Sequence, residues 1–427
     1  MRFRNLVIRN IVSPYGMTAA ALLLFLVALM FPPALYSSYI QEPDFMFFDP
    51  ASLVFFLLCT LGFLLGLMLV DFGFPVHGFR YEKKETRFSP MWFILLPLVG
   101  GTALTVFSSL LLLRNNDYLL QLLLAAEGDQ IKSGGGIELE GTIVQASLLL
   151  MGIVWWAIWR KDQFCIRGWR RIAVHSAIIL ATLAMLVAST LKLARGDVMP
   201  MFSGIAMLFL LRRLVDGKLK PMSVLKFTVF FAGSIVALFL SFSMLRGLAG
   251  PDVLIGDILG YTIAPYNRLA AIVDGRLRYP FSGRGLYISG FVAFNKTFNK
   301  LFHVNRLLAW PDFDTVWQSE FGAVTAAGLN GQLIWSGTFG DIFSDLRWLS
   351  PLLLFIYGLG TGWAWRLLKL GKTVGIVLYP WCAFCILFWF GTNYLLDPRA
   401  VVLFLVAIAL GLYELMAFRT SSSVTRE

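Results

Sequence analysis

The sequence is poor in charged residues. Only 14% of its 427 residues are Asp, Glu, Lys or Arg, well below the roughly 25% of an ordinary soluble domain. Hydrophobic residues make up 58% of the chain, more than one soluble core of this size can hide from water. The composition therefore excludes a soluble globular enzyme and a disordered chain, and it indicates a polytopic membrane protein.

Cysteine and histidine are also scarce, with four and three residues. Cys59, Cys382 and Cys385 lie in apolar runs and Cys165 lies in a basic loop, so we interpret the cysteines as packing residues rather than a disulfide framework. The motif Asp312-Phe313-Asp314 offers two carboxylates, too few for a convincing cation site. No P-loop is visible. We expect neither a metal nor a cofactor.

Ten continuous apolar stretches are long enough to cross about 30 Å of hydrocarbon at about 1.5 Å per residue. We expect them to be helices, because backbone polar groups in a bilayer must be paired internally and these stretches do not alternate at period two. They lie near residues 17–36, 51–71, 91–113, 142–160, 173–192, 198–214, 224–245, 349–367, 374–395 and 399–417. The predicted fold is all-α, with one transmembrane domain over residues 1–427.

Positive charge alternates between the loops. Lys and Arg gather at the N-terminus and in loops such as 80–87, 160–171 and 212–220, whereas residues 37–50 hold none. The positive-inside rule therefore places both termini in the cytoplasm. The net charge of +11 has the same origin, so we do not interpret it as nucleic-acid binding.

One outer segment, residues 246–348 between the seventh and eighth spans, is much longer than the other loops. Ordered loops of this length are usually functional. Within it, residues 253–273 are amphipathic and are expected in the membrane interface, and residues 321–343 form a candidate re-entrant segment. The smaller outer loop 114–141 is expected to hold an interfacial helix and a glycine-rich hinge.

Several cations lie near the predicted outer face. Lys192 and Arg195 occupy a very short outer turn, Arg246 ends the seventh span, and Arg268 and Arg284 follow in the long segment. Arginine binds phosphate through its planar fork, so these residues are candidates for an anion site such as a lipid-linked diphosphate. The alternative is that the cations reach the lipid headgroups by snorkelling.

Candidates for acid–base chemistry lie in the same long segment. Glu320, Asp341, Asp345 and His303 are each able to remove a proton from a sugar hydroxyl, and the alternative for each is a solvated loop charge. Outer aromatic residues either stack on sugar rings or form the interfacial belt of a membrane protein. These residues are Tyr261, Tyr266, Tyr287, Trp310, Trp317 and Trp335.

Three segments resemble the bacterial oligosaccharide repeat-unit polymerases, the Wzy-type O-antigen and exopolysaccharide polymerases. They are residues 189–196 with their Arg-Gly turn, the stretch from Arg246-Gly247 to Tyr261, and residues 328–343. The last contains Asn330 and Phe339-Gly340-Asp341, in an order that departs from the family's Asp-Phe-Gly-like element. By layout the resemblance covers residues 140–417.

The resemblance implies metal-independent glycosyl transfer in the bacterial inner membrane, with the active site facing the periplasm. The donor would be an undecaprenyl-diphosphate-linked oligosaccharide and the acceptor a hydroxyl of another lipid-linked unit. Arg195 and Arg246 would bind the diphosphate, supported by Lys192 and Arg268. Glu320 or Asp341 would be the base, and Asn330, Tyr261 and Arg284 would contact substrate.

The layout is similar to two other families, the O-antigen ligases and the peptidoglycan polymerases of the shape and division family. A lipid-linked oligosaccharide flippase is the alternative from a different class. We expect the partners to be the lipid-linked oligosaccharide and membrane lipids, with a chain-length regulator and export proteins as further candidates and no nucleic acid.

Overall fold

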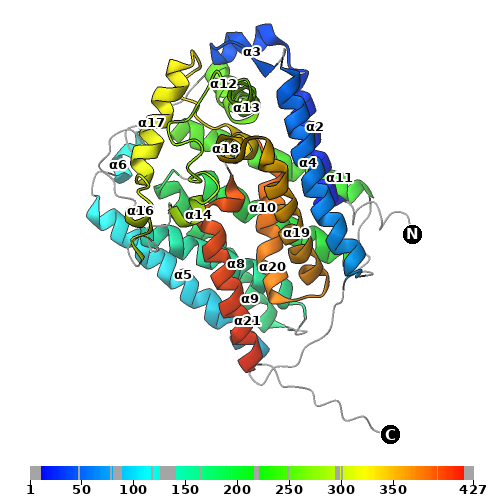
Figure 1. The fold of residues 1–427 in the computed structure, drawn as a ribbon. Coiled ribbons are helices and arrows are strands. Elements are labelled where there is room, and N and C mark those ends of the chain that lie inside the picture. Colours follow the sequence, from blue (N-terminus) through cyan, green and yellow to red (C-terminus); the bar gives the residue numbers. More distant parts are fainter. Residues whose placement is uncertain are drawn as a thin grey trace. The chain divides into compact units, whose positions relative to one another are not determined.

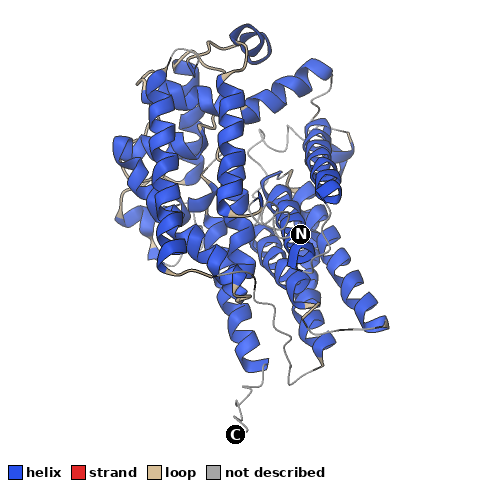
Figure 2. Cartoon of the chain, turned by 90° about the vertical axis from the view of Figure 1, so that its right-hand side faces the viewer, coloured by secondary structure: helices blue, strands red, loops and turns tan. Residues whose placement is uncertain are grey.

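The protein is built from helices. The computed structural model describes residues 11–46, 49–76, 79, 89–116, 119–125, 141–163, 166, 168–193, 195–215, 221–245, 247, 250–293, 299, 302–391 and 393–417. Within these ranges every regular element is a helix and none is a strand (Figure 2). The predicted all-α fold is confirmed for this part of the chain.

Six helical stretches in the described residues are long and apolar enough to cross a membrane. They are α4 (Pro50–Gly73), α5 (Pro90–Asn115), α8 (Gly141–Arg160), α9 (Trp169–Leu191), α18 (Gly337–Leu346) continued by α19 (Ser350–Lys369), and α21 (Pro398–Ala417). Membrane embedding is therefore supported by length and composition. The count of ten spans and the cytoplasmic position of the termini stay predictions.

The first predicted span, 17–36, is wrong as a single straight helix. α2 (Pro14–Leu29) and α3 (Pro33–Ile40) meet at a bend of 89°. Pro32 and Pro33 lie at this break, and each removes a backbone N–H that a continuous helix would need. The ninth predicted span, 374–395, also ends early, because α20 runs only over Thr373–Leu387.

The chain folds into two compact units. Unit 1 comprises Met1–Pro75, Thr228–Trp365 and Trp381–Val401, and unit 2 comprises Val76–Phe227, Arg366–Pro380 and Val402–Glu427. Unit 2 contains α10 (Arg195–Val215) and a mutually packed group of α5, α8 and α9. Its interior is lined by the buried side chains of Trp155, Trp156 and Trp159.

In unit 1, α4 and α19 pack at close range through small residues. A Cβ on Gly66 would lie 2.2 Å from the carbonyl oxygen of Phe355, and one on Gly358 would lie 2.1 Å from that of Phe63. Such helix contacts need glycine, as in the small-residue interfaces of membrane helices. The apolar helices α4 and α19 are thereby packed closely against each other.

The long segment after residue 246 folds into helices of unit 1. These are α12 (Pro251–Thr262), α13 (Ala264–Val273), α14 (Gly290–Ala293), α16 (Val304–Leu307), α17 (Phe313–Ala326), α18 and the short η2 (Arg347–Leu349). α12 lies beside α3, and α13 packs against both α18 and α4 (Figure 1). The segment is thus an integral part of the unit.

Two expectations for the outer loops are revised by this arrangement. The single amphipathic segment expected over 253–273 breaks at Ile263 into α12 and α13, and α13 is buried from Ala264 to Ile272 rather than laid on an interface. In the smaller loop, the expected helix is present as α6 (Leu119–Leu124), whereas the glycine-rich hinge lies outside the described residues.

Candidate functional site

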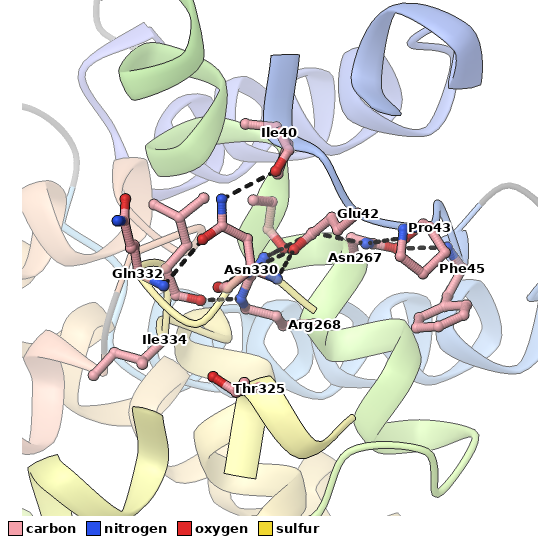
Figure 3. A network of polar contacts seen from close by, with 12 residues as sticks. Ile40, Glu42, Pro43, Phe45, Asn267, Arg268, Thr325, Asn330, Gln332 and Ile334 are labelled. Carbon is pink, nitrogen blue, oxygen red and sulfur yellow. Dashed lines mark hydrogen bonds and ion pairs between the residues drawn. The ribbon is translucent and has the colours of Figure 1, made fainter. Parts of the chain in front are cut away.

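Unit 1 contains a fully buried ion pair between Glu42 and Arg268. The Nη1 and Nη2 atoms of Arg268 donate to the two carboxylate oxygens of Glu42 at 3.0 and 2.9 Å (Figure 3). The remaining N–H groups donate to the carbonyl oxygens of Leu333, of Ala264 at 3.1 Å and of Asn330 at 3.0 Å. Each of the five N–H groups of the guanidinium therefore has an acceptor inside the protein.

Asn330 and Asn267 complete this network. Asn330 donates its backbone N–H to Glu42 at 2.8 Å and its side-chain amide to the Ile40 carbonyl oxygen at 3.0 Å. Asn267 accepts the backbone N–H of Phe45 at 2.6 Å and donates to Glu42 at 3.0 Å. The network joins the chain after α3, the buried helix α13 and the turn before α18.

This network gives two predicted substrate ligands a structural role. The side chains of Arg268 and Asn330 are hydrogen-bonded to neighbouring groups in the protein. A substrate would therefore have to displace an existing hydrogen bond to bind either residue. Their direct contact with a diphosphate or a sugar stays a prediction. What the structure shows is that they fix the backbone that leads to the acidic residues described next.

The two carboxyl groups predicted to be catalytic interact electrostatically. Asp341, on α18, accepts hydrogen bonds from Ser336 Oγ at 2.9 Å and from the backbone N–H of Asn393 at 3.1 Å. The negative charge of Asp341 acts on Glu320, which lies on α17. Burial, reinforced by the Asp341 carboxylate, raises the pKa of Glu320 to about 8, against the opposing effect of the nearby Tyr287 hydroxyl. Glu320 is therefore mostly protonated at pH 7.

Two tyrosines lie against this carboxyl pair. Tyr279 donates its hydroxyl to the Ile334 carbonyl oxygen at 2.5 Å, and burial raises its pKa, with Glu320 and Asp341 adding to the shift. The hydroxyl of Tyr287 approaches Glu320 but is buried without a hydrogen-bond partner among the described residues. Tyr279 was not predicted from the sequence, because a single tyrosine in a loop has no spacing that marks a site.

Asp345, an acid–base candidate from the sequence, instead holds a loop. Its carboxylate accepts backbone N–H groups of Gly283 at 3.0 Å, Gly285 at 3.1 Å, Tyr287 at 2.7 Å and Ile288 at 3.1 Å. Burial raises its pKa, although all four hydrogen bonds act to lower it. Asp345 thus positions the loop that carries Tyr287 toward Glu320.

Aromatic rings gather beside the same elements. Tyr261, predicted to contact substrate, lies 4.6 Å from Trp335 and 5.2 Å from Phe239 between ring centroids. Trp317, on α17 with Glu320, lies 6.3 Å from Trp335. Partly buried rings of this kind suit either a sugar face or the tails of lipid molecules.

The predicted cation cluster is only partly visible. Lys192 is buried and ion-paired with Asp197 in unit 2. Arg195 begins α10, but its side chain lies outside what the structure describes, and so does the whole of Arg246. Arg284 is exposed, with its guanidinium 5.6 Å from the Phe281 ring. The convergence of these arginines on a diphosphate therefore stays a prediction.

The residues considered as metal ligands either have other roles or lie far from further ligands. Asp312 caps α17 by accepting the backbone N–H of Thr315 at 2.7 Å, and hydrogen bonding to Thr315 lowers its pKa. His303 is exposed and begins α16 with a positive φ of 50°. Across the described part of the chain, no three His, Cys, Asp or Glu side chains are grouped so that they could share a cation.

A further buried ion pair, between Arg160 and Glu414, lies in unit 2. Glu414, inside the apolar helix α21, accepts hydrogen bonds from Arg160 at 2.5 and 2.9 Å and from Trp156 at 2.6 Å. Arg160 also donates to Gln163 at 2.6 Å and to Thr373 at 3.0 Å. Sequence analysis assigned Arg160 to a loop, because a cation at a helix end usually faces water.

Comparison of the chain with protein-family models, with curated proteins and with solved structures found no match. Function is therefore inferred from the geometry and chemistry of the site itself.

Proposed function

We propose that the protein is a glycosyltransferase that polymerises undecaprenyl-diphosphate-linked oligosaccharide repeat units at the outer face of the bacterial inner membrane. The observation that carries the proposal is that burial and the charge of Asp341 raise the pKa of Glu320 in a helical segment that adjoins apolar helices. The neighbouring hydroxyls of Tyr279, Tyr287 and Ser336 suit a substrate made of hydroxyl groups.

The two carboxyl groups divide the chemistry between them. Paired acids whose environments hold them in different protonation states supply a general acid and a general base at one pH. Asp341 is the base that takes the proton of the acceptor hydroxyl as its oxygen bonds to the anomeric carbon. The bond from that carbon to the diphosphate breaks, and protonated Glu320 donates a hydrogen bond to the departing oxygen.

The remaining candidates bind substrate. Arg195 and Arg246 stabilise the negative charge of the leaving diphosphate, a role that arginine fills without a metal. Tyr261 and the rings beside it provide a surface for the oligosaccharide. A chain-length regulator and export proteins are the expected partners of such an enzyme.

One assay separates this proposal from its alternatives. Purified protein in liposomes is given an undecaprenyl-diphosphate-linked repeat unit, and the products are resolved on a gel. A ladder of lengthened glycans supports the polymerase. Transfer only to added lipid A core indicates a ligase, and movement of the lipid across the bilayer with no new glycosidic bond indicates a flippase. Either result would refute the polymerase.

Matched carboxylate variants test the site within that assay. Glu320→Gln and Asp341→Asn keep the shape of each side chain and remove its acid–base chemistry, so each should lower the transfer rate by roughly 100-fold or more. Asp312→Asn is the control, because Asp312 is exposed and caps the helix that carries Glu320. Equal loss in all three variants would point to folding rather than chemistry.

The arginines are tested in the same way. Arg195→Ala and Arg246→Ala should each lose about 2–5 kcal/mol of charge-assisted binding if the diphosphate is desolvated. Lysine keeps the charge but not the fork, so Arg195→Lys should be impaired less than Arg195→Ala. Full polymer formation in both alanine variants would show that these arginines do not bind the diphosphate.

A further inference from the structure

Asn393 has a buried side-chain amide that lacks a hydrogen-bond partner in the part of the chain that the structure describes. The residue is only 6% exposed, and neither its Oδ1 nor its Nδ2 has a hydrogen-bond partner among the described residues. A buried polar group left unpaired costs on the order of 1–3 kcal/mol. Orphan groups of this kind are few in folded proteins and call for a reason.

The amide sits directly at the proposed site. The backbone N–H of Asn393 donates to Asp341 Oδ2 at 3.1 Å, which fixes the position of the residue against the carboxylate. The hydroxyl of Tyr357, on α19, approaches the Asn393 side chain without meeting the geometry of a hydrogen bond, and it too is buried and unpaired. Two unpaired polar groups therefore lie together beside one carboxylate.

The backbone that precedes Asn393 contacts the first turn of α18. The N–H of Thr338, in the first turn of α18, donates to the carbonyl oxygen of Trp389 at 2.9 Å. Gly337 has a φ of +70°, and a Cβ there would lie 2.8 Å from the same Trp389 oxygen. Residues 389–391 thus pack against the start of α18, and the backbone N–H of Asn393 is itself bound to Asp341, so a loosely held backbone does not explain the unpaired amide.

Asn267 provides the contrast. It is equally buried, in the same unit, and its amide is fully used: Oδ1 accepts the backbone N–H of Phe45 at 2.6 Å, and Nδ2 donates to the Pro43 carbonyl oxygen at 2.9 Å and to Glu42 at 3.0 Å. One asparagine is therefore part of the framework, whereas the other keeps a donor and an acceptor free.

We propose that the Asn393 amide binds a neutral substrate group that both donates and accepts a hydrogen bond, a hydroxyl or acetamido group of the sugar held against Asp341. The assignment rests on the proposed transfer function and deepens it. Asn393 selects and orients the sugar, because a substrate that lacks this group leaves the amide unpaired in a dry site.

The first test is the stability of the protein without substrate. Leucine has the branched shape of asparagine with bulkier methyl groups and needs no partner, so Asn393→Leu should change the midpoint of thermal unfolding in detergent only slightly, because the removal of an unpaired buried amide offsets the cost of the added volume. Asn267→Leu, the control, should lower it clearly, because it removes a hydrogen bond to Glu42 and the hydrogen bonds to three backbone groups, those of Pro43, Phe45 and Met46. If Asn393→Leu falls as far as Asn267→Leu, the amide is bonded within the protein and the proposal is overturned.

The second test measures binding through the rise in the unfolding midpoint. The probes are undecaprenyl diphosphate alone and the same carrier bearing glucose or N-acetylglucosamine. The sugar should add to the shift in the wild type, and Asn393→Leu should weaken the sugar-dependent part of the affinity about tenfold, the loss of one or two hydrogen bonds. A shift that depends on glucose assigns a hydroxyl, and one that requires N-acetylglucosamine assigns the acetamido group. Equal sugar-dependent shifts in both proteins, or none in the wild type, overturn the proposal.

The transfer assay then separates the two proposals. If the wild type binds the glycosylated carrier through Asn393 but forms no glycosidic bond, the transferase fails and the sugar contact remains. If the wild type and Asn393→Leu form polymer at equal rates, the transferase remains and the role of Asn393 is refuted.

Discussion

Glu42 Oε2 accepts the backbone N–H of Asn330 at 2.8 Å, although the two residues are 288 positions apart in the chain. The same carboxylate pairs with Arg268, so one side chain near the N-terminus fixes both a buried helix and the turn that precedes Asp341. The catalytic candidates are therefore positioned by a residue far from any of them in sequence.

Removal of the Glu42 charge should destabilise the protein strongly. Glu42→Ala leaves the Arg268 guanidinium buried without its anion, which typically costs about 3–5 kcal/mol. The unfolding midpoint of the purified protein should fall accordingly. The double variant Glu42→Leu with Arg268→Met removes both charges and should recover much of that loss. No recovery would show that the two side chains act separately.

Titration of Glu320 should make stability depend on pH. Its pKa rises from 4.5 in the unfolded chain to about 8 in the folded protein, so the folded state holds one more proton between these values. Stability should therefore fall as pH increases from about 5 to 8. Glu320→Gln should remove this part of the slope in thermal unfolding measured across that range, and an unchanged slope would contradict a raised pKa. Transfer by the wild type should decline above pH 8, as Glu320 loses its proton.

Asp345→Ala should loosen the loop over residues 283–288. The substitution leaves four backbone N–H groups without their acceptor, and it should lower stability by roughly 2–4 kcal/mol. Hydrogen exchange at these amides should accelerate, with little change in α4. Transfer should fall as well, because Tyr287 is no longer held near Glu320. Unchanged exchange in the loop would show that other contacts suffice.

Gly337→Ala should be costly for two reasons. The backbone there has a φ of +70°, and the new Cβ would lie 2.8 Å from the Trp389 carbonyl oxygen. Strain at such a position is worth about 1–3 kcal/mol. Gly322→Ala, in α17, is a matched control with open space around its Cα. Comparison of the two unfolding midpoints tests whether the contact between α18 and the 389–391 segment is required.

The sequence alone was sufficient to predict an all-helical membrane protein, because hydropathy and length decide that outcome. The sequence was not sufficient to predict where two of the helices end. The Pro32-Pro33 pair lies within an apolar run whose average hydropathy hides the bend between α2 and α3. The same averaging extended the predicted ninth span beyond Leu387, where α20 ends. Asn393, which lies past this end, donates its backbone N–H to Asp341.

The candidate site was predicted in part. Glu320 and Asp341 were named as candidates together with Asp345 and His303, because all four are titratable residues in a long segment flanked by apolar helices. The interaction of Glu320 with Asp341, and the roles of Asp345 and Asn393, depend on contacts between elements distant in the chain. No local pattern distinguishes a loop-holding aspartate from a catalytic one, because both are single acids between helices.

The distance in sequence between Glu42 and its partners also constrains how the protein is made. At about 5–20 residues per second, roughly 15 to 60 seconds separate the synthesis of Glu42 from that of Asn330. For the first 226 of these 288 residues the carboxylate has neither Arg268 nor the turn to pair with, and an unpaired charge is costly in an apolar environment. We therefore expect Glu42 to stay in contact with water until Arg268 is made, and the 89° bend between α2 and α3 keeps Glu42 off a straight continuation of the apolar helix α2.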